Sequence, residues 1–380
     1  MSSSKRAKLA QHTATDIHTT NKSGLPALPP ELLLEIASLL RLNRPTEIPN
    51  EPVNFQVLSS AEREEIRALR AISQSCRRLR QTFLPIAWDH VVVDLPTAAG
   101  SSQPGRRRTR LAIECPAELA AFKSDAVAPL VSSFVVFVSN FCTGRLLREL
   151  IPSLSFLNNL HTLCVIRLPG LYSLSQLKAS FKSSVATHRK FPSVHRLIVD
   201  PAALPLAWSC PNLRLLNVTD HFWYFDGMKD GPPLASMAQS TRNLRSFMCS
   251  LTPNVVEQLL ALKLPPTLEE LGVINIGPHS FQRVELRQIE QLAKIPSLRR
   301  LHFDTREPIP ADPRVRTDGT MYLHEATKTA WTAMCAKPGV DAHSVYVTVR
   351  ATGDEHSIGF YECRAEGWVK VAQLQETKYL

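Results

Sequence analysis

The chain carries few residues at the spacings that catalysis or metal binding requires, and the nearest approach is His324-Glu325-Ala326-Thr327-Lys328. This segment begins like the helix of a zinc peptidase, in which two histidines four residues apart bind the metal. Lys328 stands in place of the second histidine, and an ammonium group cannot serve as a neutral ligand beside His324. The segment therefore predicts a helical surface, and we expect no metal and no cofactor.

Motifs for phosphate binding and for nucleophilic catalysis are missing from the sequence. There is no GxGxxG, no GxxxxGK[ST] and no G-x-S-x-G. Eight cysteines are scattered without a CxxC pair, which indicates reduced, mostly buried thiols. We therefore expect a binding protein and not an enzyme.

Positive charge is the next feature that could bind a partner. The formal net charge is +10, and part of the excess is local, in Arg106-Arg107-Arg108 and in Arg77-Arg78. The first run follows a segment rich in Gly, Ser and Pro, and no aromatic residues are interleaved to stack bases. A solvated loop is the favoured interpretation, nucleic acid is disfavoured, and nuclear import or an acidic partner are alternatives.

An amphipathic helix near the amino end is the first element that must position a binding surface. Pro29 and Pro30 suit a first helical turn, and Glu31 lies where the helix dipole favours an anion. Apolar residues then recur at helical spacing. They are Leu32, Leu33, Ile36, Leu39 and Leu40.

Further helix is expected downstream, beginning near Ser59, whose spacing to Glu62 is that of a capping box. The apolar residues that follow a three-to-four-residue rhythm are Ile66, Leu69, Ile72, Cys76, Leu79 and Phe83. We predict a break near Ser73-Gln74-Ser75 and a helix end at Pro85, with Trp88 shortly after.

In this order the residues resemble the F-box. In that family a small three-helix unit docks on a Skp-type linker protein and so joins a cullin-based, SCF-type ubiquitin ligase. The resemblance implies that some motif residues contact the linker protein and that others hold the three helices together. The motif positions are occupied by Leu28, Pro29, Leu32, Leu33, Ile36, Leu39, Leu69, Ser73, Cys76, Leu79 and Trp88.

The resemblance covers residues 25–93 and departs from the family at a proline-rich insertion, 42–58. Loop-closure entropy grows only as ~1.5RT times the logarithm of loop length, so the insertion is thermodynamically tolerable, although it could obstruct the linker protein sterically. No apolar run approaches the ~18 residues of a membrane span, and the first two dozen residues lack the apolar core of a secretory signal. We expect an intracellular protein, cytoplasmic or nuclear, that does not cross a membrane.

Past residue 130 an irregular repeat of the form L-x-x-L-x-V appears. Its six copies begin at Leu160, Val194, Leu213, Leu244, Leu268 and Leu298. Ser133–Val138 is a degenerate earlier copy, and helix-like stretches such as 255–260 and 284–292 lie between copies. A strand and a helix per unit are typical of a leucine-rich-repeat solenoid, in which stacked units bury one continuous core. The irregular intervals also fit a generic α/β domain.

Within each copy the leucines and the valine are expected to point inward, and the intervening positions to form an exposed ladder that binds a protein target. Several ladder residues are apolar, which favours protein over a phosphate backbone. The candidates are Cys164, Ile166, Ile198, Asp200, Asn217, Thr219, Met248, Ser250, Gly272, Ile274, His302 and Asp304.

The carboxyl end breaks the repeat. One helical face carries Leu323, Ala326, Ala330, Trp331 and Met334. Three candidate strands follow, around 345–349, 358–360 and 368–371. This predicts a helix and a β-meander that cap the solenoid, with a separate ligand-binding domain as the alternative.

The sequence therefore predicts an α/β protein in five parts. They are a disordered tail (1–24), an F-box-like helical domain (25–93), a basic linker (94–129), a leucine-rich-repeat-like domain (130–305) and a capping segment (306–380). The predicted function is a non-catalytic substrate receptor, which holds an unknown protein target while the ligase transfers ubiquitin. The alternatives are a repeat scaffold without a ligase connection and a basic nucleic-acid-associated protein.

Overall fold

The computed structural model of the chain is a mixed α/β structure that divides into two units. We call Met1–Thr46 with Ala61–Ala87 the helical unit, and Glu47–Ser60 with Trp88–Leu380 the sheet unit. The residues that the structure describes are 24–40, 60–93, 119–138, 143–167, 179, 181–183, 185, 190–218, 241–249, 251, 253–262, 264–276, 284–305, 318–337, 344–350, 357–364 and 367–375. Residues 1–23 of the predicted tail, the insertion 42–58, Ser59 of the proposed capping box and Arg106–Arg108 lie outside them.

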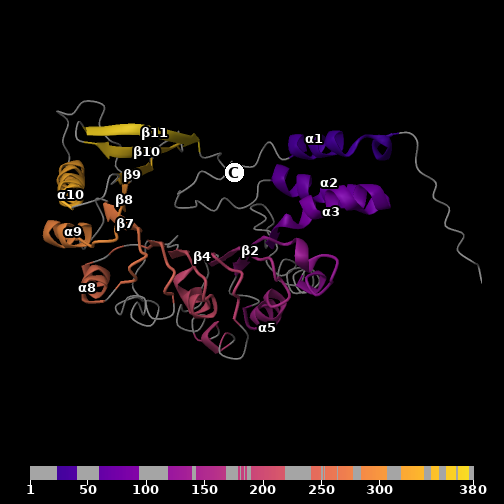
Figure 1. Cartoon of the computed structure of the whole chain (residues 1–380), viewed down its shortest axis with the longest axis horizontal. Coiled ribbons are helices and arrows are strands. Elements are labelled where there is room, and N and C mark those ends of the chain that lie inside the picture. The colour runs from indigo at the N-terminus through magenta and orange to yellow at the C-terminus, as the bar shows by residue number, and fades with distance from the viewer. Residues whose placement is uncertain are drawn as a thin grey trace, which may run out of the picture. The chain divides into compact units, whose positions relative to one another are not determined.

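The helical unit contains helices where the apolar spacing predicts them (Figure 1). They are the short 3-10 helix η1 (Leu25–Ala27), α1 (Pro30–Leu40), α2 (Ser60–Ser75) and α3 (Arg77–Asp89). Pro30 begins α1, where its missing N–H leaves no helical carbonyl without a partner. The predicted break is confirmed, because α2 ends at Ser75 and α3 begins at Arg77.

The prediction that Pro85 ends a helix is wrong, because Pro85 lies inside α3, which continues to Asp89. Proline in a helix removes one hydrogen bond and crowds the carbonyl four residues earlier. Pro85 is exposed, so this carbonyl can tilt towards water while the apolar face of the helix stays packed. Burial of Phe83 and Ala87 on either side of Pro85 stabilises the continuous helix.

Each of α1, α2 and α3 buries part of its apolar surface. The buried apolar side chains are Leu33, Ala37, Ile66, Leu69, Leu79, Phe83 and Ala87. A hydrogen bond also joins the start of α3 to the segment before α1, because Arg78 Nη2 donates to the Leu28 carbonyl oxygen over 2.8 Å. The two parts of the motif, 50 residues apart in sequence, therefore meet in one unit.

The sheet unit contains a single sheet whose strand order follows the chain, from β1 to β11. Every neighbouring pair from β1 to β9 is parallel, and β9, β10 and β11 pair antiparallel. The strands are β1 (His90–Val93), β2 (Ser133–Val138), β3 (Thr162–Arg167), β4 (Arg196–Val199), β5 (Leu215–Val218), β6 (Ser246–Met248), β7 (Glu270–Ile276), β8 (Arg300–Thr305), β9 (Ser344–Arg350), β10 (Ser357–Arg364) and β11 (Gly367–Gln375).

The six copies of the sequence repeat coincide with the six consecutive strands β3 to β8. Each strand begins two residues after the first apolar residue of its copy, and all six of those first residues are buried. Ser133–Val138, the degenerate earlier copy, is β2. The predicted strands are thus confirmed, and the constant offset explains why the copies lie in register across the sheet.

Helices cover one face of this sheet (Figure 1). They are η2 (Ala128–Leu130), α5 (Thr143–Leu154), η3 (Pro201–Ser209), α8 (Pro253–Ala261), α9 (Leu286–Ala293) and α10 (Asp318–Cys335). Their buried side chains join one apolar cluster with a cross-strand row of the sheet. That row consists of Val91, Phe134, Leu163, Leu197, Leu216, Phe247, Leu271, Leu301 and Val345.

The shortest repeat interval, from Val194 to Leu213, contains a 3-10 helix in place of an α-helix. This connection has Pro201 at its start and Pro205 inside it. Asp200 fixes its beginning, because the Asp200 carboxylate accepts a hydrogen bond from the Ala202 N–H over 2.9 Å. A 3-10 helix suits this connection because prolines remove backbone donors that a longer α-helix needs.

The carboxyl end has the predicted helix and three-stranded meander. Four of the five residues predicted to share a face of α10, namely Leu323, Ala326, Ala330 and Met334, are buried, and the fifth, Trp331, is partly buried against the same core. Because β9 pairs with β8, the meander continues the sheet from its last repeat strand. Lys337, just after α10, donates hydrogen bonds to the carbonyls of Ile295 and Leu298 and so ties the helix to the last repeat.

Candidate functional site

Helix α1 exposes more large apolar side chains than any other described element. Leu32 is 44% exposed and Leu39 is 59% exposed, whereas Leu33 between them in sequence is fully buried. Successive residues of an α-helix are turned by about 100°, so Leu32, Ile36 and Leu39 share one face. Ile36 is half-buried. We call these three residues the α1 stripe.

Leu34 is also exposed, at 52%, but it does not belong to the α1 stripe. It lies about 200° around the helix from Leu32, on the other side of the buried face formed by Leu33 and Ala37. A contiguous apolar patch on an otherwise soluble surface marks an interaction site. The α1 stripe is therefore the first candidate site of the chain.

The structure sorts the residues of the predicted motif by burial. The buried members are Leu33, Leu69, Ser73 and Leu79, the half-buried members are Leu28, Ile36 and Cys76, and the exposed members are Pro29, Leu32 and Leu39. Ser73 is buried because its hydroxyl donates to the Arg70 carbonyl over 2.7 Å. Burial separates residues that hold the unit together from residues that are open to a partner.

Trp88 lies near the end of α3, the helix that also carries the motif residue Leu79. It packs against the apolar core of the sheet unit, where its ring centroid lies 6.2 Å from that of Phe122 in an edge-to-face contact. Sequence reasoning also missed Arg78, whose hydrogen bond holds Leu28. The only signal was its place in a run of arginines, which does not indicate a backbone acceptor.

The second candidate site, the exposed ladder, is contradicted by the structure. The described ladder side chains are buried: Cys164, Ile166, Ile198, Asp200, Asn217, Met248 and His302, with the backbone of Gly272. Thr219 and Ser250, and the side chains of Ile274 and Asp304, lie outside the described part of the chain. The alternation of the repeat correctly separated these strand residues from the leucines of the main core. The expectation that they are exposed to solvent is wrong.

Cross-strand neighbours contribute to this burial. One row of paired residues runs across the second face of the sheet through Val135, Cys164, Ile198, Asn217, Met248, Gly272 and His302. Strands lie about 4.8 Å apart, so each side chain in such a row is shielded on two sides. Val135, Cys164, Ile166 and Ile198 form a second apolar cluster there.

Three cysteines of the sheet unit, Cys164, Cys210 and Cys249, are buried and poor nucleophiles. Burial raises the pKa of the Cys164 thiol, with a smaller opposing effect from the charge of Arg196, and burial raises the pKa of Cys210 to about 12. Burial likewise raises the pKa of Cys249. Since the thiolate is the reactive form, these thiols are inert structural groups.

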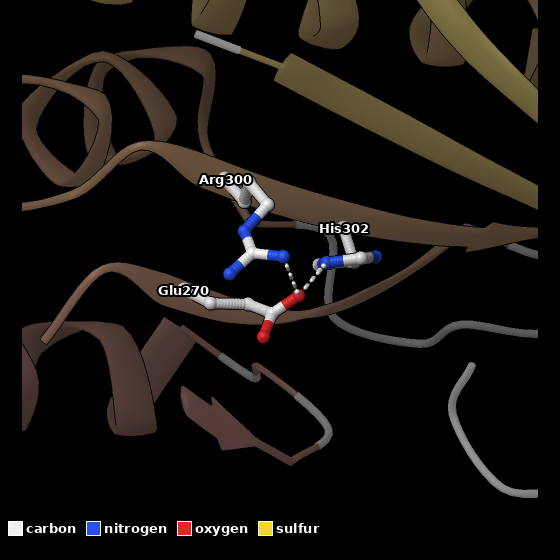
Figure 2. Close-up of polar contacts among 3 residues, drawn as sticks. All are labelled: Glu270, Arg300 and His302. Atoms are coloured by element: carbon white, nitrogen blue, oxygen red, sulfur yellow. Dashed lines mark hydrogen bonds and ion pairs between the residues drawn. The ribbon is translucent and has the colours of Figure 1, made fainter. Parts of the chain in front are cut away.

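A polar cluster lies on the same second face, at the pairing of β7 and β8 (Figure 2). Glu270 Oε1 accepts a hydrogen bond from His302 Nε2 over 2.8 Å and lies 3.8 Å from Arg300 Nη1. The side chains of Glu270 and His302 are 4% and 5% exposed, and that of Arg300 is 28% exposed. We call these three residues the Glu270 cluster.

The environment keeps the Glu270 carboxylate ionised. Burial alone raises the pKa of Glu270, but the hydrogen bond and charge of His302, with the charge of Arg300, outweigh burial and lower the pKa below its ordinary value. The sequence contains a signal for this ion pair. Glu270 and Arg300 occupy the same position of adjacent repeat copies, where opposite charges fall opposite each other.

Gly272 makes room for this cluster. A Cβ atom at Gly272 would lie 2.7 Å from the Cβ of its pairing partner His302. The register shifts between Gly272 and Ile274, so the strand bulges directly after the close approach. The glycine and the bulge together let the imidazole of His302 lie beside the carboxylate.

These geometries support binding and structural roles. Among the described residues, no group of three or more His, Cys, Asp or Glu side chains is placed to hold a metal ion. His324, Glu325 and Lys328 are exposed on α10. None of the described helices is both long and apolar enough to span a membrane. A comparison with protein-family models finds no match for the chain, and a comparison with curated protein sequences finds none either.

Proposed function

We propose that this chain is a substrate receptor of a cullin-based, SCF-type ubiquitin ligase. The helical unit docks on a Skp-type linker protein through the α1 stripe, and the sheet unit holds a protein target. The observation that carries the proposal is the exposure of Leu32 and Leu39 on the same helix whose Leu33 is fully buried. The order of motif residues that resembles the F-box supplies the class of partner.

The spacing of the α1 stripe supports docking into a groove of a partner. Leu32, Ile36 and Leu39 stand at i, i+4 and i+7, which are the anchor positions of a helix that lays its apolar face into a hydrophobic groove. Full burial of a leucine contributes roughly 1.5–3 kcal/mol. Leu32 and Leu39 are about half exposed, so a groove that covers them would gain part of this free energy at each, beside polar Glu31 and Glu35.

The buried motif residues support the same proposal from the other side of the helix. Leu33, Leu69 and Leu79 are buried, and Arg78 holds the Leu28 carbonyl. These contacts fix the orientation of α1, so the stripe is presented without an ordering cost at binding. In this assignment the exposed residues bind the linker protein and the buried residues keep the unit rigid.

The sheet unit supports a leucine-rich-repeat-like solenoid. Each of the six copies supplies one parallel strand at the same offset, and helices pack on the opposite side of the same core. Repeats that stack in one direction offer a long surface for a partner. The receptor would act by proximity, since a held target has a raised effective concentration near the transferring machinery.

Co-purification with a Skp-type linker protein tests the proposal. The double variant Leu32→Asp/Leu39→Asp should lose capture, because it places two carboxylates in the proposed contact. Leu34→Asp is the matched control: it adds a carboxylate to an equally exposed position of α1 outside the stripe, and it should retain capture. Capture that survives in the double variant would contradict the proposal and favour a repeat scaffold without a ligase connection.

A further inference from the structure

A row of mostly basic residues lies at the edge of the sheet where the parallel strands begin. Each member precedes one strand, from β3 to β8. The row consists of His161, His195, Arg214, Arg245, Glu269 and Arg299. We call it the edge row. Its positions were not part of the predicted ladder, which used alternate residues further along each strand.

The backbone holds the edge row in register. The N–H of each member from His195 to Arg299 donates to the carbonyl of the member before it, over 2.7 to 2.9 Å. The ring centroids of His161 and His195 lie 5.8 Å apart, as expected of neighbours in one row. Adjacent strands are about 4.8 Å apart, so the row is about 24 Å long from end to end.

The charge of the edge row is accessible. His161, Arg214, Arg245 and Arg299 are exposed, and His195 and Glu269 are half-buried. Among the described residues, none forms an ion pair with Arg214, Arg245 or Arg299. Arg300, the residue after Arg299, differs from these three arginines because it forms an ion pair with buried Glu270. The three arginines keep their charge and their hydrogen-bond donors for a partner.

We infer that the edge row binds an extended acidic segment of a protein. An arginine guanidinium binds a carboxylate through two parallel hydrogen bonds, and several guanidinium groups in line match carboxylates repeated along a chain. An extended peptide rises about 3.3 Å per residue, so about seven or eight residues would span the row. The inference names a target class for the proposed receptor and in that sense rests on the proposed function, but the binding itself does not require the ligase.

Two features favour an acidic peptide over a nucleic acid. Glu269 lies between Arg245 and Arg299 in the row, where it would repel an unbroken line of phosphates, whereas a peptide can place a neutral or basic residue there. The row also contains no Phe, Tyr or Trp, the side chains that build stacking platforms for successive bases, although His161 and His195 could each stack one base. The edge row therefore favours a peptide with spaced carboxylates over a nucleic acid.

Fluorescence anisotropy with a labelled peptide of about ten residues, rich in Glu and Asp, tests the inference on the full chain. The variant Arg214→Gln/Arg245→Gln/Arg299→Gln should bind about tenfold more weakly than wild type. The control Lys182→Gln/Arg287→Gln/Lys328→Gln removes the same charge from exposed positions of the sheet unit outside the row and should bind within about twofold of wild type. Glu269→Gln should bind more tightly than wild type.

Three outcomes would overturn the inference. They are no binding of the peptide, equal losses in the two triple variants, and tighter binding of a single-stranded oligonucleotide of equal charge that the edge-row substitutions abolish. Linker-protein capture is measured on the same variants and should not change. Peptide binding without linker capture in wild type would overturn the ligase proposal alone, and linker capture without peptide binding would overturn the edge-row inference alone.

Discussion

Apolar side chains are usually buried and charged side chains are usually exposed, and each unit contains an exception to one of these rules. In the helical unit, α1 exposes Leu32 and Leu39, whereas in the sheet unit β7 and β8 bury Glu270 and His302. An exposed apolar side chain gains free energy only when a partner covers it. A buried carboxylate is tolerated only while its internal partners remain. The exposed leucines of α1 are therefore available to a partner, whereas the buried carboxylate of Glu270 interacts with side chains of its own unit.

The largest expected effect separates two neighbours on α1. Leu33→Ala should lower the free energy of unfolding of the helical unit by about 2–5 kcal/mol, because it opens a cavity at a fully buried position. Leu32→Ala should lower it by much less, about 1 kcal/mol at most, since its side chain is 44% exposed and its removal leaves no enclosed cavity. Denaturant unfolding of the two variants measures both values. Equal losses of unfolding free energy in the two variants would show that the α1 stripe is part of the core. The helical unit would then have no exposed apolar site to compare with the buried Glu270 cluster.

The next largest effect is expected when the buried carboxylate of Glu270 is removed. Glu270→Ala should destabilise the sheet unit by about 2–4 kcal/mol, because it leaves His302 and Arg300 without their carboxylate. Glu290→Ala is the matched control on α9, where an exposed carboxylate pairs with Lys294, and it should have little effect. Thermal unfolding compares the two variants. If Glu270→Ala is as harmless as the control, the Glu270 cluster does not support the sheet.

A smaller effect is expected at Gly272. Gly272→Ala should destabilise the sheet unit by about 1–3 kcal/mol, because the added methyl group would overlap the Cβ atom of His302. The variant Gly272→Ala/His302→Gly tests the cause. The two losses should be less than additive, since the second substitution removes the Cβ atom that the added methyl group would overlap. Additive losses would assign the cost to the backbone and not to the contact.

The sequence predicted the strands well because the repeat fixes both their position and their register. The first apolar residue of each copy, from Leu160 to Leu298, is buried two residues before a strand. Exposure could not be predicted in the same way. Whether Cys164 or Met248 is open to solvent depends on residues in neighbouring strands, about 30 positions away in sequence. The edge row was missed for the same reason, since only cross-strand register brings its members together.

The α1 helix shows the same limit on a smaller scale. Helical spacing indicated an apolar face wide enough to bury, and it placed Leu32 and Leu33 on that face together. The structure buries Leu33 and leaves Leu32 exposed, because the remaining helices of the unit cover only part of the face. The motif residue Trp88 likewise contacts Phe122, a partner that the motif does not reveal. Long-range partners decide which part of a predicted face stays open.

The smallest effect concerns pH and again compares the two units. The folded-state pKa of Glu270 is lowered, so its contribution to stability is present above the ordinary glutamate pKa of about 4.3 and is lost as the pH falls through the folded-state pKa. The stability difference between wild type and Glu270→Gln should therefore shrink when the pH is lowered from 7 towards 3. The difference between wild type and Leu33→Ala should not shrink in this way, because the cavity contains no titrating group. Denaturant unfolding at several pH values measures both differences, and a constant difference for Glu270→Gln would mean that the Glu270 cluster does not hold its carboxylate in the ionised form.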